Sequence, residues 1–250
     1  MNIDWKKSLI VAADIAIAAY LLLAVTAFNV PDDKATRCTE VKIDIKQTQV
    51  DGFLNAGEIK KILDGSHLYP LSQPMDRINP RLIEEALEKS PFVESAECYK
   101  TISGHVCVDV HQRIPVVRVI SGSGASYYVD THGNIMPETR YVTELIIATG
   151  AISRKYAQTA LSKVANYIIQ DNFWKNQIVQ INVLANGTME LVPRVGDHIV
   201  YLGAPQNVDK KLERLRKFYL YGLNKAGWNK YYYISLEFDN QIICKKNKRR

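Results

Sequence analysis

The first apolar segment of the chain spans residues 8–28 and contains one carboxylate, Asp14. A helix needs about 20 apolar residues to cross a bilayer, and Lys6 and Lys7 provide the basic flank that such a segment carries. The apolar residues after Asp14 also have the length of an export signal, and residues 25–27 (Val-Thr-Ala) resemble the small-residue site at which such a signal is cleaved. The pattern therefore allows a permanent membrane anchor or a cleaved signal.

The position of Asp14 favours an anchor. A carboxylate at the centre of a spanning helix costs roughly 2.5–3.5 kcal/mol on insertion scales, and the cost is smaller near a helix end. Asp14 lies nearer the end that follows Lys6 and Lys7, and the leucines and isoleucines of the segment offset its cost. In both interpretations the chain after Phe28 is exported and the lysines stay inside.

The next part of the chain alternates between strand-like and helix-like patterns. The predicted elements are a strand at 40–45, a helix after Asn55, a helix from Pro80 that ends before Pro91, and strands at 92–100 and 105–112. Asn55 and Glu58 have the spacing of a capping box, and Asn79 precedes Pro80 as a second cap. The pattern predicts a small α+β domain in the order strand, helix, helix, strand, strand.

A second block begins near Pro115 and is richer in strands. It predicts strands at 116–120, 126–129, 145–149, 178–184, 188–193 and 198–202, helices from Ser153 and along the stripe that starts at Val208, and two strand-like runs around Asp239-Asn240. Asn186-Gly187 is a strong hairpin signal. The predicted fold class is α+β, with a larger, mostly antiparallel β domain and packed helices after the small domain.

Composition and charge exclude some classes of protein. Hydrophobic residues make up 47% of the chain and charged residues 23%, which is typical of a folded protein. The net charge is +6, but the last six residues contain five lysines and arginines, so the rest of the chain is nearly neutral. A general nucleic-acid surface is therefore not expected. The basic tail 245–250 is best explained as solvated, with attraction to anionic lipid or to an acidic partner as the alternatives.

Four cysteines in an exported chain allow three full disulfide connectivities: Cys38, Cys98, Cys107 and Cys244. Their spacing does not match a zinc site. Cys98 and Cys107 lie on adjacent arms of the predicted hairpin and point to opposite faces, so a bridge between these two is not favoured.

Enzymatic chemistry is not indicated by any motif. The five histidines are scattered, with no paired spacing of a metal-binding helix, and neither a nucleophile elbow nor a P-loop is present. Asp130 and His132 form a candidate acid–base pair, but an aspartate two residues from a histidine before Gly133 more often stabilises a turn. No catalytic residue, metal or cofactor is predicted.

Several longer stretches carry a resemblance to a known family. They are "SPFVESAECYKTISG", "VDVHQRIPVVRV", "YYVDTHGNIMP" and "ISLEFDNQII". In this order they resemble the Bacteroidetes branch of the FtsQ/DivIB family of bacterial cell-division proteins, and the small domain looks like a POTRA domain. Together with the apolar segment, the resemblance covers nearly the whole chain.

The resemblance implies a single transmembrane helix, because this family is anchored and its first segment is not cleaved. The implied organisation is a cytoplasmic segment 1–7, a transmembrane anchor 8–28, a linker 29–38, a POTRA-like domain 39–115, an FtsQ-type β domain 116–244 and the basic tail 245–250. The protein is then expected in the inner membrane at the division septum, with its C-terminal domains in the periplasm.

The implied function is that of a non-enzymatic, bitopic scaffold. Members of the family bind FtsB/DivIC-type and FtsL-type division proteins and help to position septal peptidoglycan synthesis. A POTRA-containing assembly or secretion factor shares the fold, but would ordinarily carry several POTRA units or a membrane barrel. A cell-envelope enzyme is the third alternative.

The terminal run 231–246 is the predicted partner-binding edge, because it is strand-like, ends the chain and matches the distal contact strand of the family. The predicted contact residues are Tyr233, Ser235, Leu236, Phe238, Asn240 and Ile242. Asp14 is predicted to meet a polar group on a partner's spanning helix, since carboxylates in membranes usually face a bundle interior.

Overall fold

The computed structural model describes residues 5–27, 36–46, 54–139 and 145–247. The predicted linker 29–38 and basic tail 245–250 lie partly outside these residues. Helix α1 (Trp5–Ala27) contains neither glycine nor proline, and alanine and leucine, which favour helices, dominate it. Its described leucines and isoleucines are more than half exposed. Among the described residues, no helix combines the length and apolar character needed to cross a membrane.

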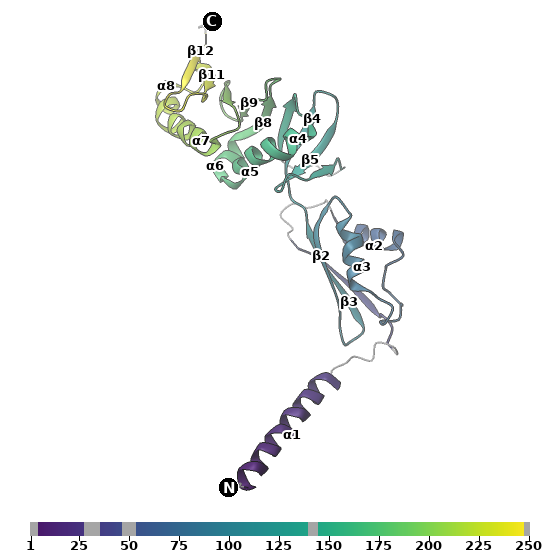
Figure 1. Cartoon of the computed structure of the whole chain (residues 1–250). Helices are drawn as coiled ribbons and strands as arrows, with labels where there is room; N and C mark the ends of the chain where they lie inside the picture. The colour runs from purple at the N-terminus through teal and green to yellow at the C-terminus, as the bar shows by residue number, and fades with distance from the viewer. Residues whose placement is uncertain (1–4, 28–35, 47–53, 140–144, 248–250) are drawn as a thin grey trace.

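The small domain has the predicted order of elements, as Figure 1 shows. They are β1 (Glu40–Lys46), α2 (Ala56–Gly65), α3 (Pro80–Glu88), β2 (Val93–Lys100) and β3 (His105–Gln112). The sheet order is β1-β3-β2, with β1 parallel and β2 antiparallel to β3. Ile59 and Leu63 of α2 and Leu87 of α3 are buried together with valines of β3.

The predicted capping box of α2 is confirmed. The side chain of Asn55 accepts a hydrogen bond from the Glu58 N–H at 3.0 Å, and Glu58 Oε2 accepts one from the Asn55 N–H at 3.1 Å. Two N–H groups that the helix itself cannot pair are thereby satisfied. Asn79 likewise accepts from the Arg81 N–H at 3.1 Å, ahead of Pro80 at the start of α3.

The cysteines of the hairpin face opposite sides of the sheet, as predicted. Cys98 lies across from Val108 and Tyr99 across from Cys107, so the two cysteines belong to different faces. The thiols of all four cysteines, which lie among the described residues, are free. Burial raises the pKa of the Cys98 thiol to about 12, which keeps it in the unreactive protonated form.

The large domain is built on one sheet of nine strands, in the order β12-β11-β10-β9-β8-β7-β4-β5-β6. The strands are β4 (Pro115–Ser121), β5 (Ser126–Asp130), β6 (Ile135–Pro137), β7 (Ile146–Gly150), β8 (Ile178–Val183), β9 (Met189–Pro193), β10 (Ile199–Gly203), β11 (Tyr231–Ser235) and β12 (Ile243–Lys246). The sequence pattern did not predict β6, which has only three residues.

The sheet is mixed, although most of its strand pairs are antiparallel. The parallel pairs are β4–β7, β7–β8 and β10–β11. Parallel neighbours need a crossover connection. The helices between β7 and β8 and those between β10 and β11 supply two of these connections, which explains why the helical segments interrupt a strand-rich sequence.

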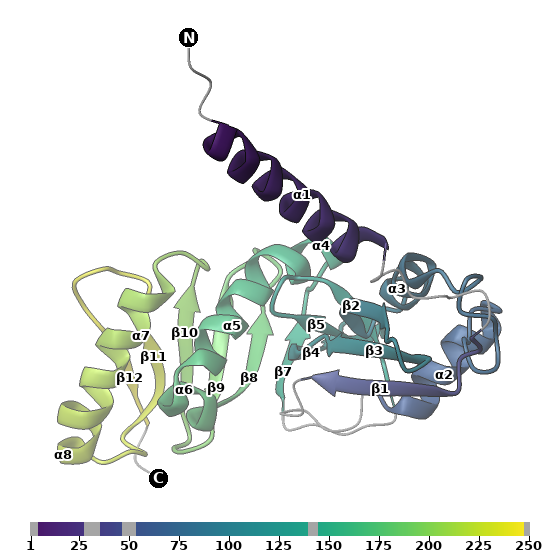
Figure 2. The same cartoon turned by 90° about the horizontal axis from the view of Figure 1, so that it is seen from below.

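Two groups of helices lie side by side on the same face of this sheet, as Figures 1 and 2 show. The first consists of α4 (Arg154–Tyr156), the π-helix η1 (Ala157–Leu161), α5 (Ser162–Gln170) and α6 (Asn172–Gln177). The second consists of α7 (Val208–Lys217), the π-helix η2 (Phe218–Leu223) and α8 (Asn224–Ala226). The predicted stripes, such as Leu161 with Ile168 and Leu212 with Leu215, are buried against the sheet, together with Trp174.

An ion pair joins the two domains. Arg113 follows β3, and its Nη1 donates to Asp130 Oδ2 at 2.8 Å while its Nη2 donates to the Val93 carbonyl at 2.9 Å. The side chain of Asp130 is fully buried. Apolar packing lies beside the pair, because Phe92 of the small domain packs against Tyr128 and Met136 of the large one.

Asp130 also stabilises its own turn, as predicted. Its Oδ1 accepts hydrogen bonds from the N–H groups of His132 and Asn134. Burial by itself raises the pKa of Asp130, but the hydrogen bonds from Arg113 and Asn134 more than offset burial and leave the pKa lowered. The carboxylate therefore stabilises the fold at neutral pH, and this contribution is lost as the pH falls through the lowered pKa.

Replacing Asp130 with alanine should destabilise the protein by about 3–5 kcal/mol, because the largely buried Arg113 would lose its charged partner and the turn would lose its acceptor. Unfolding in guanidinium chloride measures the change. Asp239→Ala is the matched control, since Asp239 is 75% exposed and lies 4.0 Å from Arg214. The control should lose less than about 1 kcal/mol. Equal losses in the two variants would refute a special role for the interdomain pair.

Candidate functional site

The open edge of the large sheet nearest the C-terminus is β12, not β11. Strand β11 pairs with β10 on one side and with β12 on the other. Strand β12 pairs with β11 alone and ends the sheet. Within the described part of the chain, the backbone groups on the outer side of β12 therefore have no strand partner, and another strand can be added there.

The outward-facing backbone groups of β12 follow from its hydrogen bonds. The Asn247 N–H, just beyond the strand, donates inward to the Lys230 carbonyl at 3.0 Å. Backbone groups alternate in direction along a strand, and the irregularity in this pair lies on β11, so the alternation along β12 is regular. The N–H groups of Cys244 and Lys246 therefore point away from β11.

The predicted contact residues fall into two groups. Ser235 and Leu236 are buried, and Leu236 belongs to the core under the helices. Ile242 is half-buried and packs against the same core. Phe238 is 48% exposed, and Asn240 is also exposed, in the connection between β11 and β12. The structure thus places Phe238 and Asn240 on the surface and the other three wholly or partly inside.

Tyr233 lies on the sheet face opposite the helices. Its ring stacks on that of Tyr201 at 6.0 Å between centroids, and Lys245 Nζ lies 4.8 Å from its centroid. Burial, followed by the negative charge of Glu190, raises the pKa of Tyr233, so the phenol stays neutral. Tyr233 therefore links β10, β11 and β12 through its ring.

Two basic residues of α7, not predicted from the sequence, bond to backbone carbonyls just beyond the ends of β10 and β11. Arg214 Nη2 donates to the Leu236 carbonyl at 3.1 Å, where β11 ends. Lys211, which is buried, donates to the Ala204 carbonyl at 2.7 Å, and its burial lowers its pKa. No signal in the sequence indicated these roles, because basic residues beside an apolar stripe such as Leu212 and Leu215 are usually solvated and a buried lysine is rare.

The edge itself is basic and partly apolar. Lys245 and Lys246 are exposed on β12, and Ile243 is 42% exposed. Tyr232 of the neighbouring strand is 46% exposed. This combination favours an added strand that carries acidic and apolar side chains.

Asp14, the other predicted contact residue, lies in α1 and is exposed. No hydrogen bond or ion pair of its side chain is formed with another described residue. Elsewhere in the described part of the chain, no group of three His, Cys, Asp or Glu side chains is placed to hold a metal ion.

Comparisons with known families match both domains. A family described as "FtsQ/DivIB, C-terminal related" matches residues 114–245, which is more than half of the chain. The POTRA-like domain family matches residues 36–111. No curated protein matches the chain. The first match includes β12 as far as Lys245, together with Arg214 and Leu236.

The exposed and buried residues of the terminal run should respond differently to truncation. Leu236→Ala should destabilise the protein by about 2–5 kcal/mol, because it leaves a cavity in the core. Phe238→Ala should change stability by less than about 1 kcal/mol, since its ring is half-exposed. Thermal or chemical unfolding of both variants checks this. A larger loss for Phe238→Ala than for Leu236→Ala would contradict the assignment.

Proposed function

Because the chain belongs to the FtsQ/DivIB family, we propose that it is a bitopic scaffold of the division septum that binds FtsB/DivIC-type and FtsL-type partners. Proteins of this family are in general non-enzymatic division scaffolds. The proposal includes positioning of septal peptidoglycan synthase components, but no binding of nucleic acid. In this proposal, partners bind by adding a strand to a sheet edge, and no cofactor takes part.

The observation that carries the proposal is the open edge of β12. In strand addition, backbone hydrogen bonds supply affinity and alternate side chains supply specificity. The Cys244 and Lys246 N–H groups are available as donors, and Lys245 and Lys246 attract an acidic segment. Phe238 and Asn240 are exposed in the connection that leads into this strand, and the proposal counts them as rim contacts.

Buried residues of the run contribute indirectly. Leu236 and Ile242 pack against the core. Ser235 pairs with Tyr201 and Ile243 in the sheet. Tyr233 supports Lys245 through its ring. Deleting the chain from Ile234 onward would remove core residues and would therefore confuse loss of folding with loss of binding. The edge is better tested by a single backbone donor.

We also propose that residues 8–28 anchor the protein in the inner membrane, with the N-terminus cytoplasmic and both domains periplasmic. No helix in the described part of the chain has both the length and the apolar character needed to cross a membrane, so the proposal rests on the sequence of residues 8–28 and on the length of α1. Helix α1 has 23 residues. At 1.5 Å per residue it is about 35 Å long, compared with roughly 30 Å for the hydrocarbon core of a bilayer. Lys6 and Lys7 precede the apolar residues, as the positive-inside bias requires. Residue 28 lies outside the described residues.

Lys246→Pro tests the edge. Proline removes the outward N–H of Lys246, while an edge strand tolerates proline where the N–H faces solvent. Recovery of FtsB/DivIC-type and FtsL-type partners with tagged full-length protein, quantified by mass spectrometry, should fall at least about tenfold, as expected when a buried acceptor loses its donor.

Lys246→Ala is the matched control for this variant, because it removes the same side chain and keeps the N–H. It should retain most of the partner recovery, and both variants should unfold at similar temperatures. Full partner recovery with a folded Lys246→Pro protein would reject strand addition at β12. Absence of any division protein from the wild-type capture would reject the scaffold itself.

Asp14→Leu tests the proposed contact within the membrane. The variant should remain in the membrane fraction, since leucine favours insertion, and should recover less of at least one membrane partner. Ala13→Leu is a suitable control, because it adds a similar volume one residue away without removing a carboxylate. Unchanged recovery of every partner would show that Asp14 makes no such contact. A soluble wild-type product that begins near Phe28 would disprove the anchor.

A further inference from the structure

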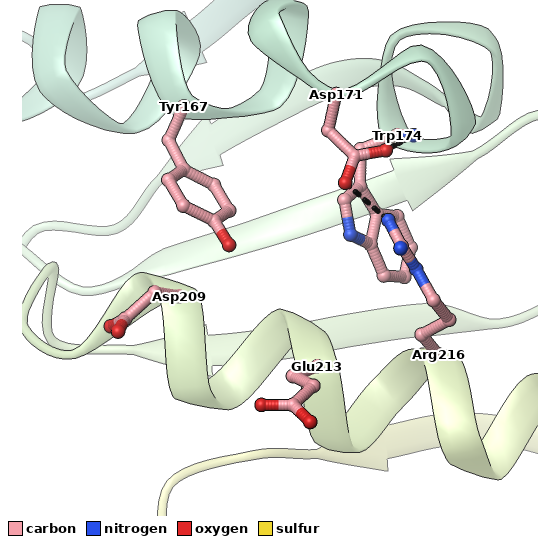
Figure 3. Close-up of a pocket in the computed structure, with 6 residues that line it drawn as sticks. All are labelled: Tyr167, Asp171, Trp174, Asp209, Glu213 and Arg216. Atoms are coloured by element: carbon pink, nitrogen blue, oxygen red, sulfur yellow. Dashed lines mark hydrogen bonds and ion pairs between the residues drawn. The ribbon is translucent and has the colours of Figure 1, made fainter.

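A groove between α5, α6 and α7 lies on the helical face of the large domain, away from the sheet edge. It encloses about 140 Å³ and is lined by Tyr167, Asp171, Trp174, Asp209, Glu213 and Arg216. Tyr167 lies on α5, Asp171 at the junction before α6 and Trp174 on α6, whereas the other three residues lie on α7 (Figure 3). Pockets for drug-sized molecules are larger, at roughly 300–1,000 Å³, so this groove fits one small polar group.

A buried side chain, Trp174, presents a donor without a protein partner to the groove. Trp174 is 1% exposed, and Figure 3 shows its indole nitrogen on the side of the ring that faces Tyr167. Within the described residues, the indole N–H donates to no protein group. Because the N–H opens into the groove, a ligand that brings an acceptor can replace the water that reaches it.

Two exposed carboxylates of α7 line the rim of the groove. Asp209 and Glu213 are four residues apart, which places both on one side of the helix. Like charges at this spacing destabilise a helix by about 0.2–0.5 kcal/mol. Lys217 pairs with Glu213 at 2.8 Å, whereas Asp209 has no ion pair among the described residues. A bound cation would relieve this repulsion.

The other charged residues of the groove neutralise one another. Arg216 hydrogen-bonds to Asp171, and its guanidinium lies 5.7 Å from the centroid of the Trp174 ring. Burial and the negative charges of Asp209 and Asp171 raise the pKa of Tyr167, so its hydroxyl stays protonated. Within the described residues, the groove therefore offers two groups without a protein partner, the Asp209 carboxylate and the Trp174 N–H.

We propose that this groove binds the amino terminus of a peptide. The ammonium group would lie beside Asp209 and Glu213, and the carbonyl oxygen next to it would accept the hydrogen bond from Trp174. A lysine side chain carries the charge but no adjacent acceptor, and a neutral amide carries the acceptor but no charge. A group that carries both the positive charge and the adjacent acceptor complements the whole site.

The test uses the full-length protein in detergent micelles with ¹⁵N-labelled tryptophan. The chain has three tryptophans, and replacing Trp5 or Trp228 with phenylalanine assigns their indole signals. Glycinamide, which carries an ammonium group and a carbonyl, should shift the Trp174 signal saturably, with a midpoint in about the millimolar range. The Trp228 indole already donates to Asn224 Oδ1 at 3.0 Å, so its signal should not move.

Two further probes separate the halves of the site. Ethylamine supplies the charge alone and N-acetylglycinamide the carbonyl alone, and each should bind at least about tenfold more weakly than glycinamide. Equal binding of ethylamine would overturn the role of Trp174, and equal binding of N-acetylglycinamide would overturn that of the carboxylates. No saturable shift with glycinamide would overturn the proposal.

Variants complete the test. Asp209→Asn combined with Glu213→Gln should abolish the glycinamide shift and leave the Trp228 signal in place, which shows that the domain is folded. Asp64→Asn combined with Glu97→Gln changes the net charge equally on the exposed surface of the small domain and should keep the shift. Lys246→Pro should also keep the glycinamide shift. A failure of ligand binding in the groove can therefore be told apart from a failure of partner binding at β12.

Discussion

The need to pair backbone groups governs the large domain. A nine-stranded open sheet has two edges, and each edge presents N–H and C=O groups without a strand partner. At one end, β6 has only three residues and finishes at Pro137, which has no N–H to offer. At the other end, β12 carries exposed lysines but keeps the outward N–H groups of Cys244 and Lys246. The two edges differ in their capacity to accept a strand.

Local signals predicted the elements well, because they depend on residues close together in the chain. The capping box of Asn55 and Glu58, the turn of Asp130 and the opposed faces of Cys98 and Cys107 all follow from spacings of ten residues or fewer. The parallel pairs did not follow from the sequence, since a strand looks the same whichever direction its neighbour runs. The position of β11 inside the sheet depends on such a pair.

The terminal run shows where the alternation rule fails. Along β11, Tyr233 and Ser235 share one face and Ile234 and Leu236 the other, so a strand pattern can assign faces only as far as Leu236. Beyond Leu236 the chain leaves the strand, so alternation no longer assigns the side chains to faces, and Phe238 is exposed. A set of contact residues read along the whole run therefore mixes core and surface positions.

Helix α7 connects these features, because each of its sides contacts a different part of the domain. Leu212 and Leu215 enter the core, while Arg214 holds the end of β11 through the Leu236 carbonyl. On another side, Arg216 bonds to Asp171 some 45 residues earlier in the chain, and the groove beside them contains Asp209 and Glu213. A shift of this helix would change both the groove and the support of the sheet edge. Since the core fixes α7 rigidly, the fold holds the two surfaces in a constant relation to each other.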